Sequence, residues 1–381
     1  MSTSQSSPPF ASPSSPYAAR ARAAILAVSA SLITSVAYSG LVATDTSVPR
    51  VMDQGGTAGD PARYVIGLNG PVSHSSTWDV TVGEYRSHNE LLIRNGSSYT
   101  VHNDGGMIGW ESDHNTVTVS GPGSRWILGG TSGMLTVGWN GSHNRLVVEN
   151  GGLVSNGWSA EIGRGENSRH NSVLITGPGS RWESEPVSLD GGGHNSIVIE
   201  NGGVLTTTYG FSWIGKFEDA PQNSVHVTGP GSAWFNDGGL FISESQGNTL
   251  TIENGGLVTL QTHFGFEVDA STDNHVRLNG GFLALSGDQI NLLETLIADG
   301  AFQLWNGTEW VTGDASSFTY GYFSYANETA AELLTGHKDL GNFTIITAAY
   351  VAPIPEPAAF AALAGLGALT LCGTRRGRRL R

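Results

Sequence analysis

The chain has 381 residues, of which 53 are glycine and 14% are charged. This composition is typical of proteins rich in turns and strands and disfavours a helical enzyme. The formal net charge of -14 disfavours binding to nucleic-acid backbones and to anionic membranes, because both are themselves negative.

Residues 1–39 are predicted to be a secretion signal with a long leader rich in Ser and Pro. Arg20 and Arg22 precede an apolar run from Ala23 to Ala37. The end of this run, Ala37-Tyr38-Ser39, has small residues where a signal peptidase reads them. A core helix is the alternative, but the leader offers nothing for such a helix to pack against. We therefore expect export and cleavage.

After a predicted linker at 40–63, one repeat dominates residues 64–285. In each copy an asparagine is followed two and four positions later by apolar residues. The eight copies begin at Asn89, Asn115, Asn144, Asn171, Asn195, Asn223, Asn248 and Asn274. They recur about every 26 residues, a period typical of solenoid coils. Period-two alternation predicts strands, Gly-rich segments predict turns, and no convincing helical period is present. The sequence thus predicts an all-β, single-stranded parallel β-helix of about eight coils.

The repeated asparagine is expected to point inward, because it lies two residues before an inward apolar side chain. Its amide could then bond the coils above and below as a ladder. The alternative is a turn-forming residue at the start of each strand.

The copies alternate in kind, so the unit is predicted to be two coils. One kind continues into Asn-Gly-Gly, and the other into Gly-Pro-Gly-Ser followed one residue later by Trp126, Trp182 or Trp234. These tryptophans would recur about every 10 Å and could form a row of platforms that stack on sugar rings. Alternatively, each could pack over the turn beside it.

A histidine precedes the asparagine in five successive copies, as His88, His114, His143, His170 and His194. In register, these rings would be stacked about 5 Å apart and would repel one another when protonated near pH 6. A metal site is one interpretation, and an outward-facing turn residue is the other. We favour the second, because a one-dimensional column fits tetrahedral coordination poorly.

No catalytic site, cofactor or metal is predicted. Polysaccharide-cleaving β-helices gather carboxylates at one place, whereas here the acidic residues recur in turns. They are Asp104, Asp190 and Asp237 in Asp-Gly-Gly, and Glu149, Glu200 and Glu253 before Asn-Gly-Gly. The glutamates come from every second coil, about 10 Å apart, too far to share a proton or a metal easily. Every polar column is therefore expected to be repeated, and none to be singular.

Residues 286–352 are predicted to form an atypical cap, because the ends of a solenoid expose unpaired strand edges. This region is rich in aromatic residues, including Trp305, Trp310 and Tyr320, and has a short helical segment near Ala330–Leu334. The aromatic residues could instead bind a ligand.

Residues 353–381 place three features in a fixed order. Pro355-Glu356-Pro357 is followed by an apolar stretch from Ala358 to Cys372, and then by Arg375, Arg376, Arg378, Arg379 and Arg381. The stretch is shorter than the ~20 residues that comfortably span a bilayer, and the arginines should stay on the cytoplasmic side. Because the tail holds the only cysteine, a processed body would contain no disulfide.

This tail resembles the PEP-CTERM sorting signal of Gram-negative bacteria. The resemblance implies recognition by an exosortase, removal of the tail, and release or attachment at the cell surface, often in organisms that make exopolysaccharide. The body is similar to Gly-rich repeats of PEP-CTERM proteins and autotransporter passengers, for example at Leu135-Thr136-Val137-Gly138 and Asn150-Gly151-Gly152-Leu153-Val154. This likeness covers residues 64–285 and implies a right-handed parallel β-helix outside the cell.

The sequence therefore predicts an exported structural or adhesive protein of the cell surface or extracellular matrix, and no enzyme. The alternative is a carbohydrate-binding protein or a polysaccharide lyase or glycoside hydrolase. The expected partners are a signal peptidase, an exosortase-type enzyme and exopolysaccharide, with no nucleic acid. Contact with the membrane is expected only through the terminal segments.

Overall fold

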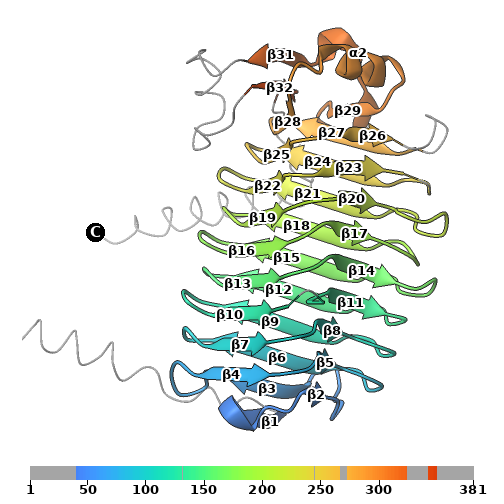
Figure 1. Ribbon diagram of the computed structural model, residues 1–381. Coiled ribbons are helices and arrows are strands. Elements are labelled where there is room, and N and C mark those ends of the chain that lie inside the picture. The colour runs from blue at the N-terminus through green and yellow to red at the C-terminus, as the bar shows by residue number, and fades with distance from the viewer. Residues whose placement is uncertain (1–39, 131, 244, 267–272, 324–341, 350–381) are drawn as a thin grey trace, which may run out of the picture. The chain divides into compact units, whose positions relative to one another are not determined.

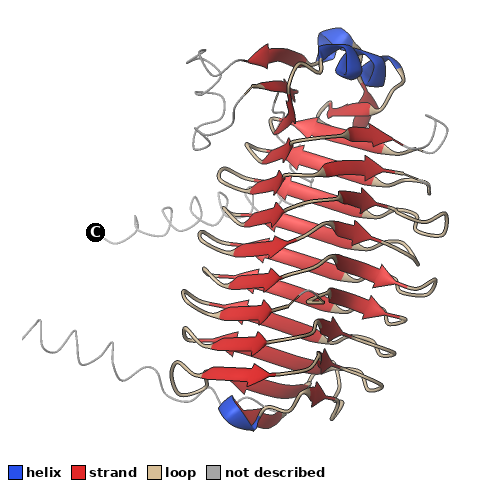
Figure 2. Ribbon diagram, viewed as in Figure 1, coloured by secondary structure: helices blue, strands red, loops and turns tan. Residues whose placement is uncertain are grey.

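The computed structural model describes residues 40–130, 132–243, 245–266, 273–323 and 342–349. In this part, the chain winds into a parallel β-solenoid of about ten coils, each of about 26 residues (Figure 1). Strands dominate the coils, and the α-helix found among the described residues is α2 (Ile290–Ala298), as Figure 2 shows. The fold class predicted from the repeat is confirmed.

Each full coil gives one strand to each of three sheets, which we name A, B and C in the order in which a full coil runs through them. Sheet A has twelve strands: β1 (Leu41–Thr44), β3 (Ala62–Ile66), β6 (Asn89–Arg94), β9 (Thr116–Ser120), β12 (Arg145–Glu149), β15 (Ser172–Thr176), β18 (Ser196–Glu200), β21 (Ser224–Thr228), β24 (Thr249–Glu253), β27 (His275–Asn279), β29 (Phe302–Trp305) and β30 (Trp310–Thr312). Sheet B has eleven strands: β4 (Ser73–Ser76), β7 (Ser98–Val101), β10 (Arg125–Leu128), β13 (Leu153–Asn156), β16 (Arg181–Ser184), β19 (Val204–Thr207), β22 (Ala233–Asn236), β25 (Leu257–Leu260), β28 (Phe282–Ser286), β32 (Phe343–Thr347) and β31 (Thr319–Phe323). Sheet C has nine strands: β2 (Val51–Met52), β5 (Val80–Val82), β8 (Gly106–Ile108), β11 (Leu135–Trp139), β14 (Ala160–Arg164), β17 (Val187–Leu189), β20 (Phe211–Ile214), β23 (Gly239–Ile242) and β26 (Phe264–Phe266).

The coils stack in one register, so equivalent side chains form columns along the solenoid. In sheet A, Leu146 on β12 lies between Val117 on β9 and Val173 on β15. Buried and half-buried positions alternate along β9 and β15, as the period-two pattern predicts. The inward columns of Val, Ile and Leu merge into one continuous core.

The alternation of two kinds of coil has a hydrogen-bonded basis. The hydroxyl oxygen of the serine in each Gly-Pro-Gly-Ser turn accepts a hydrogen bond from the glycine N–H of the Asn-Gly turn one coil earlier. Gly96 donates to Ser124 Oγ, Gly151 to Ser180 Oγ and Gly202 to Ser232 Oγ, each at 3.0 Å. One kind of turn therefore supplies a donor and the other an acceptor, which favours their alternation.

The solenoid starts earlier than predicted. Residues 40–63, expected to be a linker, contain β1 and β2, which pair in parallel with β3 and β5. These coils escape a search for the repeated asparagine, because the register places Ala62 where Asn89 stands in the next coil. The same happens at the other end, where β29 pairs in parallel with β27 without an asparagine of its own. The count of about eight coils was therefore too low.

Antiparallel pairs close the C-terminal end of the stack. β32 pairs antiparallel with β28 and with β31, and β29 with β30. Helix α2 lies at the same end and buries Leu293 and Ile297 in the core (Figure 1). Short 3-10 turns occur at Asp45–Ser47 and Ala315–Ser317. The helical segment predicted near Ala330–Leu334 lies outside the described residues, and α2 was not predicted from the sequence.

Candidate functional site

Trp126, Trp182 and Trp234 lie on β10, β16 and β22 and point into the core. Each is at most 1% exposed. Within sheet B they alternate with smaller inward residues, namely Val154, Leu205 and Val258. A buried indole has no face free for a sugar, so the prediction of a glycan platform at these tryptophans is wrong. Each tryptophan is at an inward-facing position of its strand. Arg125 and Arg181, which precede Trp126 and Trp182, face outward.

The repeated asparagines form a continuous buried ladder. The Oδ1 atom of each accepts the backbone N–H of the asparagine one coil earlier at 2.8–2.9 Å, from the pair Asn89–Asn115 to the pair Asn248–Asn274. The side-chain NH2 groups from Asn89 to Asn248 donate to neighbouring loops, for example from Asn144 to the Ser112 carbonyl at 3.0 Å. These contacts satisfy donors and acceptors that water cannot reach.

A glycine column stands against this ladder at the ends of the sheet C strands. Its members have positive φ and are Gly83, Gly109, Gly138, Gly163 and Gly215. A Cβ atom on Gly109 would overlap the side-chain amide of Asn144, and a Cβ on Gly138 would overlap that of Asn171. Both the backbone conformation and the lack of space therefore require glycine.

The five histidines form one stack at the turn that leads from sheet C to sheet A. We call His88, His114, His143, His170 and His194 the histidine column. Their φ angles lie between 57° and 62°, in the left-handed region. Neighbouring ring centroids are 4.8–4.9 Å apart, with interplanar angles from 6° to 25°. The stacking predicted from the sequence is confirmed.

The spacing of the histidine column does not suit a shared metal ion. Parallel rings displaced by 4.9 Å carry equivalent nitrogens about 4.9 Å apart. Two nitrogens bound to one Zn²⁺, each about 2.1 Å from it, lie at most about 4.2 Å apart. Over the described ranges, no group of three or more His, Cys, Asp or Glu side chains could hold a metal ion.

A second stack lies one short loop before the histidine column. The ring of Trp110 stacks on that of Trp139 with centroids 4.5 Å apart, and the Arg164 guanidinium lies 3.8 Å from the Trp139 ring centroid. The rings cover one another, and the guanidinium adds a cation-π contact. Trp110, Trp139 and Arg164 precede His114, His143 and His170 along the chain.

A third group of rings lies on the outer face of sheet C near the C-terminal coils. We call Phe211, Trp213, Phe241 and His263 the aromatic patch. Trp213 stacks on Phe241 at 4.8 Å, and Phe211 contacts Phe241 at 5.2 Å and His263 at 5.7 Å. Phe211 remains 43% exposed. In the sequence, Phe211 and Trp213 flank the small Ser212, which is typical of two rings on one face of a strand. No site was predicted from this segment.

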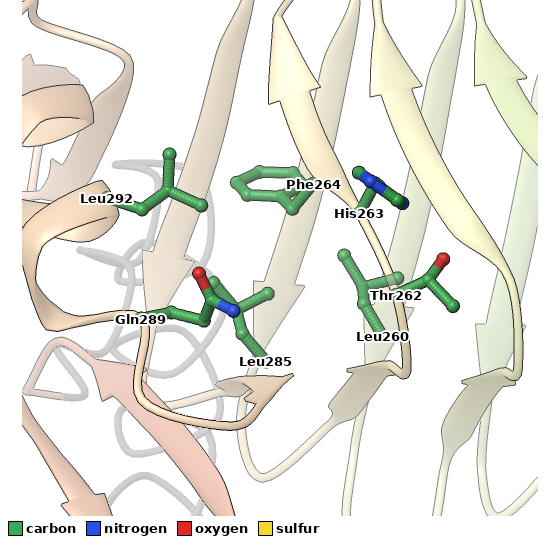
Figure 3. Close-up of a pocket in the computed structure, with 7 residues that line it drawn as sticks. All are labelled: Leu260, Thr262, His263, Phe264, Leu285, Gln289 and Leu292. Atoms are coloured by element: carbon green, nitrogen blue, oxygen red, sulfur yellow. The ribbon is translucent and has the colours of Figure 1, made fainter.

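A pocket of about 360 Å³ adjoins the aromatic patch at His263. Figure 3 shows His263, Thr262 and Phe264 on one side, facing Gln289 and Leu292 of the segment around α2. Leu260 and Leu285 also line it. Four of the seven residues that line it are apolar and three are polar, so its wall is mixed in character.

Asp190 interrupts the glycine column, because the register aligns it with Gly163 and Gly215. Its side chain is 2% exposed, and within the described chain its Oδ1 atom has no hydrogen-bond partner. Burial raises the pKa of Asp190 to about 7; Lys216 opposes the shift and Glu161 adds to it. A carboxyl with such a pKa could serve as a general acid, but one so deeply buried cannot reach a polymeric substrate.

The carboxylates thus follow the predicted columns only in part. Glu149 and Glu200 belong to alternate coils, with Thr176 between them in the register, as expected. Asp104 and Asp237, in contrast, precede sheet C strands, whereas Asp190 follows one. The same tripeptide serves two different turns, so the three aspartates are not one column. Asp190 is not repeated at its position, whereas the sequence predicts that every polar column is repeated and that none is singular.

We expect Asp190→Asn to flatten the dependence of stability on pH. In the unfolded chain this carboxyl loses its proton first, near the ordinary aspartate pKa of 3.8, so the folded state loses stability as pH rises from about 4 to about 7. Asparagine cannot ionise, so the urea midpoint of Asp190→Asn should exceed that of the native protein at pH 8 and match it more closely at pH 5. The exposed Asp237, as Asp237→Asn, is the control. An unchanged pH dependence in Asp190→Asn would contradict this account.

The sorting residues Pro355, Glu356, Pro357, Arg375, Arg376, Arg378 and Arg379 lie outside the described residues, as does the predicted secretion signal. Within the described part, no helix combines the length and apolar character needed to cross a bilayer.

The fold defines the chain as a parallel β-solenoid. No family model, no curated protein and no solved structure matches it. Inferences about its function therefore rest on its own residues.

Proposed function

We propose that this chain is an exported structural or adhesive protein of the bacterial cell surface or extracellular matrix. The observation that carries the proposal is the uninterrupted parallel stack, in which side chains repeat in columns along the solenoid. The asparagine ladder stabilises this stack internally, and the histidine column displays a linear array outside. Such an array suits contact with an extended partner better than it suits turnover of a small substrate.

The proposed location rests on the two ends of the sequence. The apolar run after Arg20 and Arg22 supports export through a signal peptidase. Pro355-Glu356-Pro357 and the arginines that follow the apolar stretch support sorting by an exosortase-type enzyme. The acidic composition supports a hydrated particle with no nucleic-acid partner.

Carbohydrate binding is a second candidate function, and the aromatic patch is the observation that favours it. Phe211, Trp213 and Phe241 present ring surfaces on consecutive coils, next to the pocket at His263. Phe211 is exposed, and Trp213 and Phe241 are half-buried; accessible ring faces of this kind can stack on the apolar faces of sugars. The site differs from the buried tryptophan row predicted from the sequence.

A glycan array, run with and without calcium, together with reducing-end release from acidic polysaccharides, tests both candidates. We expect no release of reducing ends. If the aromatic patch binds sugars, the double variant Trp213→Ala/Phe241→Ala should lose about 1–3 kcal/mol of binding free energy for its glycans. The control is Trp78→Ala/Tyr85→Ala, which removes two exposed rings outside the patch. Saturable turnover would overturn the structural proposal, and unchanged binding by the double variant would exclude the patch.

A further inference from the structure

The histidine column places five titratable groups in one row on the surface. His114, His143 and His170 are exposed, and His88 and His194 are half-buried. The spacing of 4.8–4.9 Å repeats over four successive pairs. Each ring carries a positive charge when protonated, so the column can present either a neutral row or a row of positive charges.

The charged groups around the column are of both signs. The five loops contribute Glu84, Arg86, Glu111, Asp113, Glu166, Arg169 and the buried Asp190, and the first outward positions of the sheet A strands contribute Glu90 and Arg145. The Asp113 carboxylate accepts the Ser142 N–H at 2.7 Å, and Glu90 pairs with Arg63 at 2.6 Å. Because carboxylates outnumber arginines here, this edge is negative when the histidines are neutral, and its sign depends on the protonation state of the histidines.

Neighbouring imidazolium rings repel one another at this spacing, so full protonation needs a counter-charge. Partial burial, His170 and Arg169 together lower the pKa of His194, which shows the direction of this effect. A small anion would neutralise one or two rings. A linear polyanion that runs parallel to the solenoid would neutralise the whole column and release its own counterions.

We propose that the histidine column is a pH-dependent binding site for a linear acidic polysaccharide. A polysaccharide with one carboxylate per sugar carries charges at a spacing comparable to that of the coils. A nucleic-acid strand is more densely charged, with one phosphate about every 3.4 Å, so its charges do not match the repeat of the coils. This inference rests on the proposed adhesive function and gives it a partner class and a pH range.

The test measures binding of polygalacturonate to the purified full-length protein by calorimetry at pH 5.5 and pH 7.5. We expect affinity about tenfold or more higher at pH 5.5, uptake of protons on binding, and weakening by salt. The variant His114→Asn/His143→Asn/His170→Asn should lose most of this pH dependence. Asparagine tolerates the left-handed backbone, and Gln222 already occupies the equivalent position two coils beyond His170.

The matched control is His102→Asn/His226→Asn, which removes two histidines outside the column and should keep the pH dependence. Equal affinity at both pH values, or full pH dependence in the triple variant, would overturn the inference. Tighter binding of a single-stranded RNA at pH 5.5 would also overturn it. None of these outcomes depends on the glycan array or on the assay of reducing ends, which test the proposed function separately.

Discussion

Replacing Asn144 with alanine is expected to destabilise the protein by about 3 kcal/mol or more, because several buried groups lose their partners at once. The Asn144 Oδ1 atom accepts both the backbone N–H and the side-chain NH2 of Asn115, at 2.9 and 3.0 Å. Its own NH2 donates to the Ser112 carbonyl. Alanine removes all three contacts and leaves the Asn115 N–H without an acceptor. Urea unfolding monitored by circular dichroism measures the loss.

Two comparisons identify the ladder as the cause. Thr118→Ala changes an outward residue on β9, the strand beside Asn144, and should have little effect. Asn274→Ala, at the last rung, removes the acceptor for the Asn248 N–H, but the Asn274 NH2 has no partner within the described residues. The free energy of unfolding lost in Asn274→Ala should therefore lie between the losses in Thr118→Ala and Asn144→Ala. If Asn144→Ala were no more harmful than Thr118→Ala, the ladder would not be a main source of stability.

The sequence predicted the coils best where local chemistry repeats. Asn144 followed by Leu146 and Val148 predicts a strand and identifies its inward-facing residues. The same pattern about 26 residues away predicts the strand that pairs with it. Where the end coils lack the asparagine, as at Ala62, only the pairing in three dimensions identifies them. Helix α2 was missed because its apolar residues fall in a short stretch outside the repeat.

The candidate sites were predictable when they depended only on register. The histidine column follows directly from five histidines at one position of the repeat. The inward direction of Trp182 could not be predicted in this way, because the Gly-Pro-Gly-Ser turn does not determine which residues of the next strand face the core. Asp190 could not be recognised as singular, since its role depends on the glycine column that it interrupts. The aromatic patch depends on Phe211 and His263 meeting across two coils, over Gly239, which has no side chain to separate them.

Trp182→Ala is expected to cost about 3–5 kcal/mol, the usual range for removing a large buried aromatic side chain from a packed core. The Trp182 indole is fully buried between Val154 and Leu205 of the adjoining coils. Neither neighbour is large enough to fill the resulting cavity. Thermal or urea unfolding should show the loss, and the exposed Trp158 provides a control as Trp158→Ala. A loss similar to that of the control would mean that the core around Trp182 collapses to refill the space.

Replacing a buried tryptophan with phenylalanine separates the contribution of packing to stability from the contribution of the indole hydrogen bond. Trp182 Nε1 donates to Asn156 Oδ1 at 2.8 Å, and Trp234 Nε1 donates to Thr207 Oγ1 at 3.0 Å. In the coil before Trp126, Val101 occupies the position that Asn156 and Thr207 occupy in their coils. Trp126 Nε1 therefore has no partner in the described structure. Trp182→Phe should therefore cost about 1 kcal/mol more than Trp126→Phe, the usual net contribution of one hydrogen bond. Equal losses at both positions would show that the stability of these coils depends on the volume of the ring and not on its N–H.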